Sequence, residues 1–216
     1  MNTKTLAALV AAAALALGAA ACGGSDEGET SSAAAAPTPV AGIASLSGRT
    51  TSVALDAGFV EALGSLKLTP APLGSAEISS AGVASFPITG GNVKYYTPGT
   101  VSPYVQGLIA HDGSGLSLTG GGKTVELTDF SVDPGKSLLT GKVTVDGEVA
   151  AESAPLFFLD GRTLKPLQTA GDTAVLEGTT VKLKAEAAEL LNQTFGVDAL
   201  TEGLVIGIAK IEINTA

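Results

Sequence analysis

The chain has 216 residues, of which 45% are hydrophobic and only 4% aromatic, and its formal net charge at pH 7 is −9. A surface with this excess of acidic groups repels nucleic acid and anionic lipid headgroups, so neither is expected as a partner of the folded surface. The chain contains one cysteine, Cys22, which excludes intramolecular disulfides and cysteine-based metal sites.

The first residues have the three-part pattern of an export signal. Lys4 supplies a positive charge, an apolar run covers 6–17, and small residues precede Cys22. The apolar run is shorter than the roughly 20 residues that a membrane-spanning helix needs. We therefore expect residues 1–21 to be a signal peptide that is removed, with Cys22 as the first mature residue.

The position of Cys22 resembles the lipobox of bacterial lipoproteins, in which the thiol receives a diacylglyceryl group before cleavage. Ala19 stands where that pattern usually has a branched apolar residue, and the alternative is an ordinary cut after Ala21 that leaves an unmodified thiol. The resemblance implies acyl chains such as palmitate on Cys22 and an anchor on the extracytoplasmic face of the cell membrane. Residues 22–46 lack a periodic apolar pattern and are expected to form a flexible tether.

The remaining residues, 47–216, are expected to form one β-rich domain. Short runs of alternating apolar and polar residues are separated by turn sequences at 90–92, 112–113, 120–122, 133–135, 146–147 and 160–161. Such spacing predicts a mainly β fold, an antiparallel β-sandwich or flattened barrel with two short helices. The predicted strands are 51–55, 66–71, 76–80, 83–88, 93–96, 104–110, 116–119, 125–130, 138–145, 156–159, 173–176, 180–183 and 204–213.

Two segments have helical patterns. Residues 56–66 begin at Asp56, a good N-cap, and have apolar residues at spacings of three and four. Residues 185–195 contain good helix formers and end before Gly196, a typical C-cap. Because similar sequences precede both helices, we predict two strand–helix–strand units whose ends lie together; the alternative is a chance match between Ala- and Thr-rich segments.

The candidate binding residues lie in the middle of the domain. His111 is the only histidine, and Tyr95, Tyr96 and Tyr104 are the only tyrosines. Histidine and tyrosine on neighbouring strands can bind haem iron or line an aromatic pocket. The alternative is that His111 caps a turn and the tyrosines pack on one face of the sheet.

Two motifs in this region resemble the HtaA domain. They are Phe86-Pro87-Ile88-Thr89-Gly90-Gly91 and His111-Asp112-Gly113-Ser114-Gly115-Leu116, with Val125-Glu126-Leu127 further on, and the likeness covers residues 83–176. HtaA domains are β-rich haem-binding modules of the corynebacterial cell envelope, in which a tyrosine near the start of the domain is the axial ligand and a histidine supports it. This chain has no tyrosine before Tyr95 and therefore no counterpart of the axial ligand. Of the two residues that the resemblance implies, only His111 has a match.

Catalytic motifs are poorly supported. The glycines at 120–122 precede Lys123 and Thr124, but Ser117 stands where a phosphate-binding loop needs glycine, and no G-x-S-x-G element accompanies His111. We expect no enzyme and no metal site, but a binding or interaction module of the cell envelope. Its partner is expected to be a small apolar ligand or an envelope protein; the alternatives are a structural lipoprotein without a ligand and a haem-binding surface protein.

Overall fold

The computed structural model describes residues 36–215, which form a 13-stranded antiparallel sheet and two α-helices. The predicted signal peptide, Cys22 and the first part of the predicted tether lie outside the described residues. The elements are β1 (Ala41–Ile43), β2 (Thr50–Leu55), α1 (Ala57–Ser65), β3 (Thr69–Gly74), β4 (Glu77–Ile78), β5 (Val83–Pro87), β6 (Gly90–Tyr95), β7 (Val105–Gly120), β8 (Lys123–Asp133), β9 (Leu138–Val145), β10 (Glu148–Asp160), the single 3₁₀ turn η1 (Gly161–Thr163), β11 (Gln168–Ala170), β12 (Thr173–Leu183), α2 (Ala185–Phe195) and β13 (Val205–Asn214).

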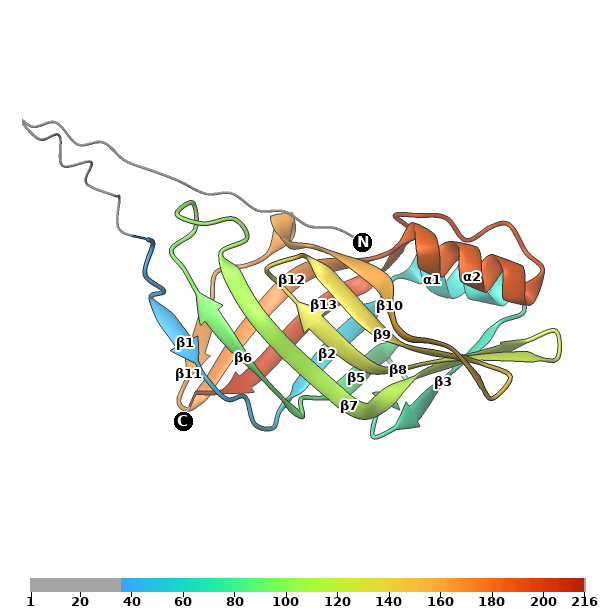
Figure 1. Cartoon of the computed structure of the whole chain (residues 1–216), viewed down its shortest axis with the longest axis horizontal. Helices are drawn as coiled ribbons and strands as arrows, with labels where there is room; N and C mark the ends of the chain where they lie inside the picture. Colours follow the sequence, from blue (N-terminus) through green and yellow to red (C-terminus); the bar gives the residue numbers. More distant parts are fainter. Residues whose placement is uncertain (1–35, 216) are drawn as a thin grey trace, which may run out of the picture. The chain divides into compact units, whose positions relative to one another are not determined.

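The sheet curls into a half-barrel, with the two helices together at one end (Figure 1). Its strand order is β1-β6-β7-β8-β9-β10-β12-β13-β2-β5-β4, with β3 added to β7 and β11 to β12. The chain runs directly from β5 into β6 through Ile88 and Thr89, and the Thr89 amide donates to the Ala110 carbonyl of β7 at 2.9 Å. This link brings the two ends of the strand order together. The mainly antiparallel β fold with two short helices is thus confirmed, as one curled sheet.

Both helices form where the sequence predicts them. The Asp56 side chain accepts hydrogen bonds from the amides of Gly58, at 2.9 Å, and Phe59, at 3.3 Å, so it caps α1 as expected. Gly196 ends α2 with φ of 67°, in the left-handed region that glycine adopts without strain. The apolar faces of both helices join the core of the sheet.

The turn predicted at Asp112-Gly113 is wrong. β7 continues through it as one strand of 16 residues, and the register with β8 shifts between His111 and Gly115. The Gly113 amide donates to the Asp129 side chain of β8 at 2.9 Å, which holds a bulge where a hairpin was expected. The predicted break between 173–176 and 180–183 is likewise a register shift inside β12, and the turn predicted at 90–92 lies within β6.

The bulge changes which side chains of β7 face the core. Before it the odd-numbered residues Ile109 and His111 point inward, and after it the even-numbered Leu116 and Leu118 do so. A strand without a bulge keeps one parity along its length, because successive side chains alternate between the two faces. The bulge therefore allows one long strand to supply inward side chains to two different parts of the core.

The two predicted strand–helix units are present and their ends meet. β2 pairs with β13 along its whole length, from Leu55 opposite Gly207 to Thr50 opposite Glu212. The strands that follow the helices differ, however, since β13 lies between β12 and β2 whereas β3 pairs with β7.

The end of the segment expected as a tether contacts the domain. β1 pairs with β6, and Leu46 is buried in the core. Within residues 36–215, neither helix has the length and apolar character needed to cross a bilayer.

Candidate functional site

The curled sheet lines an apolar cavity of about 610 Å³. Its walls are inward side chains of strands on both sides of the half-barrel, among them Val53, Ala84, Phe86, Phe130 and Ala209. Connections between strands line it as well, through Pro103 and Tyr104 before β7, Pro134 after β8, and Leu164 and Leu167 after η1. A cavity of this size is in the range of small-molecule sites, and its lining suits an apolar occupant.

Among the titratable side chains that line the cavity, His111 is the most buried, with 2% of its surface exposed. Its Nδ1 lies 2.9 Å from the Pro87 carbonyl oxygen, and its Nε2 lies 3.2 Å from the Thr51 hydroxyl. A carbonyl can only accept, so Nδ1 carries the proton, and Nε2 accepts from the Thr51 hydroxyl. Burial lowers the pKa of His111, and the hydrogen bond to the Pro87 carbonyl opposes this only in part. The imidazole is therefore neutral near pH 7.

Aromatic rings fix the orientation of His111. Phe86 contacts it edge-on with ring centroids 6.3 Å apart, and Phe130 packs edge-on against Phe86 at 5.2 Å. The Ser114 hydroxyl, on the bulge, donates to the His111 carbonyl at 3.0 Å. The F-P motif and the histidine motif singled out in the sequence thus meet in space, through the Phe86 ring and the Pro87 carbonyl.

Two of the three candidate tyrosines line the same cavity, at a distance from His111. Tyr95 and Tyr104 pack edge-on with ring centroids 5.6 Å apart, and both face the cavity. Burial, and then the neighbouring Tyr95, raise the pKa of Tyr104, so its hydroxyl stays protonated. Tyr104 precedes His111 by seven residues of extended chain, which is roughly 20 Å. Tyr96, by contrast, is not among the residues that line this cavity.

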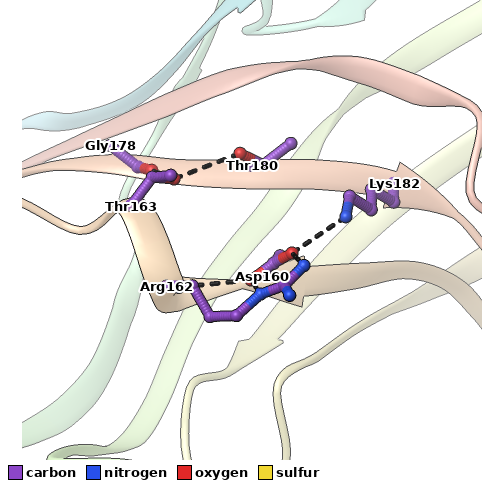
Figure 2. A network of polar contacts seen from close by, with 6 residues as sticks. All are labelled: Asp160, Arg162, Thr163, Gly178, Thr180 and Lys182. Carbon is purple, nitrogen blue, oxygen red and sulfur yellow. Dashed lines mark hydrogen bonds and ion pairs between the residues drawn. The ribbon is translucent and has the colours of Figure 1, made fainter.

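A polar network supports the connection after β10, as Figure 2 shows. The Asp160 carboxylate accepts from Arg162 Nε at 2.9 Å and from Lys182 Nζ at 2.8 Å, and the Thr163 hydroxyl donates to the Gly178 carbonyl at 2.6 Å. The hydrogen bonds from Arg162 and then Lys182 hold the pKa of Asp160 far below its ordinary value. The network fixes η1 to β12 just before Leu164, which lines the cavity.

The sequence did not single out several residues that matter here. Thr51 was expected only as a strand residue, and Asp160 only as a turn residue. Thr51 lies 60 positions from His111, so no local pattern could connect the two. Among the described residues there is no group of three or more His, Cys, Asp or Glu side chains that could hold a metal ion.

A smaller cavity of about 170 Å³ lies beside the first, toward the helices. Phe59 and Leu63 of α1, Ala187 and Leu191 of α2, and Leu127 of β8 contribute to its walls. Four apolar residues border both cavities: Leu55, Leu116, Phe157 and Ile206.

Comparison with solved structures identifies the fold. The C-terminal domain of HtaA from Corynebacterium glutamicum superposes with a TM-score of 0.53 at 15% sequence identity, covering 80% of this chain and 98% of that domain. The heme binding protein HtaB from the same organism is similar at a TM-score of 0.38 and 12% identity, covering 81% of this chain and 96% of that protein. The superposition on the HtaA C-terminal domain shows that this chain has the fold of that domain, in agreement with the resemblance in its motifs. No family model matches the sequence, and no curated protein does.

Proposed function

We propose that this protein is a non-catalytic binding module that holds a small apolar ligand inside its half-barrel. The observation that carries the proposal is the apolar cavity of about 610 Å³ on the inner side of the curled sheet. A structural protein without a ligand would gain stability by filling such a space, because each missing contact in a core costs free energy. The open space therefore favours ligand binding over a purely structural role.

Two variants of neighbouring residues on β13 test this. Ala209 is buried and lines the cavity, whereas Ile208 is 41% exposed on the outer face of the same strand. Fluorescence titration with the apolar probe 1-N-phenylnaphthylamine should show saturable binding to the wild type and to Ile208→Phe. Ala209→Phe places a ring in the cavity and should weaken binding at least about tenfold. Absence of saturable binding to the wild type, or equal binding by Ala209→Phe, would contradict the proposal.

Haem is the alternative that the fold suggests. The residues of the cavity do not provide the tyrosine–histidine pair that the HtaA resemblance implies. His111 Nε2 meets the Thr51 hydroxyl, and Tyr104, against which Tyr95 packs, precedes His111 by roughly 20 Å of extended chain. Titration with haemin should accordingly give no Soret band that depends on His111. A sharp band that His111→Ala removes would favour haem over other apolar ligands.

We further infer that the domain acts on the extracytoplasmic face of the cell membrane, held by acyl chains on Cys22. The support is the sequence alone: an apolar segment at 6–17, small residues at 18–21 and one cysteine directly after them. In detergent phase separation the wild type should enter the detergent phase, and Cys22→Ser should stay in the aqueous phase. Equal partition of the two proteins would contradict lipidation.

A further inference from the structure

We propose that the ligand is an unbranched acyl chain that passes from the large cavity into the smaller one. This inference rests on the proposed function and names the chemical class of the ligand. It depends on how the two cavities adjoin, on what lines the smaller one, and on where polar groups lie.

The residues that the two cavities share are all apolar. Leu55, Leu116, Phe157 and Ile206 border both of them. Leu55, Leu116 and Phe157 are only partly buried although they pack against the core. Side chains that face open space on two sides lose few contacts when they change rotamer, so this partition can open to a narrow passage.

The bulge of β7 explains why the passage lies there. Ile109 and His111 face the large cavity, and Leu116 and Leu118, after the change of parity, face the smaller one. Leu116 is the first inward residue past the bulge and borders both cavities. The route therefore passes the bulge, where a bulged strand changes direction. A flexible chain can follow such a route, whereas a rigid planar ring system cannot.

The lining of the smaller cavity suits only the hydrocarbon part of a ligand. Its walls are side chains such as Phe59, Leu63, Leu127 and Leu191, and Glu186, the one charged residue along it, is 57% exposed on α2. A polar group placed there would lose its hydrogen bonds to water without replacement. The polar end of the ligand is therefore expected in the large cavity, whose lining includes Tyr95 and Tyr104.

Affinity as a function of chain length tests the proposal. Each methylene transferred from water to an apolar site improves affinity about fourfold, so wild-type affinity should rise from octanoate to dodecanoate to hexadecanoate. Ala154 lines only the smaller cavity, and Ala150 is exposed on the same strand. Ala154→Leu should weaken hexadecanoate binding on the order of tenfold or more and leave octanoate binding unchanged, while Ala150→Leu should match the wild type for both acids.

A second variant covers the case in which Ala154→Leu does not fold. Ala187→Leu fills the smaller cavity from α2 and should give the same selective loss of long-chain binding. Wild-type affinity that stops rising at octanoate, or hexadecanoate binding that neither filling variant weakens, would overturn the proposal. If 1-N-phenylnaphthylamine binds but chain length has no effect, only this inference fails; if neither probe nor acid binds, the proposed function fails as well.

The acyl chain could belong to a free fatty acid or to a membrane lipid. Hexadecanoate and hexadecanoyl lysophosphatidylcholine carry the same chain, so their relative affinities identify the source. Tighter binding of either one supports the inference and assigns the head group. Binding of neither, by a protein that still binds octanoate, contradicts it.

Discussion

His111 and Thr51, 60 residues apart in the chain, are joined by a buried hydrogen bond of 3.2 Å between the imidazole Nε2 and the threonine hydroxyl. Thr51 lies on β2 and His111 on β7, so the bond crosses the half-barrel between strands that are not neighbours in the sheet. Together with the bond from Nδ1 to the Pro87 carbonyl, it satisfies both ring nitrogens of the neutral imidazole. The pair closes the half-barrel at this point and leaves His111 no unpaired nitrogen for a ligand.

Protonation of His111 should destabilise the fold. Because burial holds the pKa of His111 below its ordinary value of 6.5, the unfolded chain takes up a proton at a higher pH than the folded chain does. The stability contributed by neutral His111 is thus complete above about pH 6.5 and is lost as the pH falls from there toward the folded-state pKa. Urea unfolding at pH values from about 8 to 5 should show this decline in the free energy of unfolding.

The variant His111→Gln provides the control, since it removes the only histidine and keeps a side chain able to form hydrogen bonds. It should be less stable than the wild type near pH 8, yet its stability should change less between pH 6.5 and 5. An equally steep decline in the variant would assign the pH dependence to the carboxylates.

Thr51→Val should cost about 1 to 2 kcal/mol of stability, because it leaves His111 Nε2 buried without a donor. Thr50, the preceding residue of β2, is the matched control, since its hydroxyl donates to the Phe86 carbonyl at 3.0 Å from a less buried position. Thr50→Val should cost less in the same urea titration. Equal losses would mean that the hydrogen bond to His111 contributes no more to stability than the bond from Thr50 to the Phe86 carbonyl does.

Asp160→Ala should destabilise the protein more than Arg162→Ala. Asp160 is nearly buried, with 8% of its side-chain surface exposed, and its loss leaves Lys182, 24% exposed, without its carboxylate partner. We expect the loss on Asp160→Ala to be about 2 kcal/mol. Arg162 is 82% exposed, and in Arg162→Ala the Lys182 side chain still pairs with Asp160.

The contribution of Asp160 to stability should depend on pH. Since the pKa of Asp160 is lowered in the fold, this contribution should persist above its ordinary pKa of 3.8 and be lost as the pH falls below that value.

Local sequence was sufficient to predict the helices and the true hairpins. Asp56 and Gly196 determine helix ends through hydrogen bonds and backbone angles that depend on a few adjacent residues. Asp146 and Gly147, both with positive φ, form the predicted turn between β9 and β10 for the same reason.

Asp112-Gly113 shows why local sequence was insufficient elsewhere. The pair suits a hairpin and a bulge equally well, because both need a glycine with positive φ. The partner strand decides between them: the Asp129 side chain of β8 accepts from the Gly113 amide, and β7 therefore runs on. The cavity depends on this bulge and on contacts such as that of His111 with Thr51. The sequence therefore shows which residue types belong to the candidate site, but it does not show how they are arranged.

Replacing a glycine by alanine should change the stability of the protein in opposite directions at two positions, Gly115 and Gly64. A Cβ on Gly115, directly after the bulge, would collide with the Leu127 carbonyl oxygen and lie 2.8 Å from Thr128 Cα, both backbone atoms of β8. Because backbone cannot move aside as a flexible side chain does, Gly115→Ala should cost about 2 kcal/mol or more. Gly64 lies in α1 with open space where a Cβ would be, so Gly64→Ala should stabilise the protein by about 0.5 kcal/mol. Urea unfolding of both variants checks the opposite signs; a neutral Gly115→Ala would show that β7 and β8 can separate at the bulge without loss of the fold.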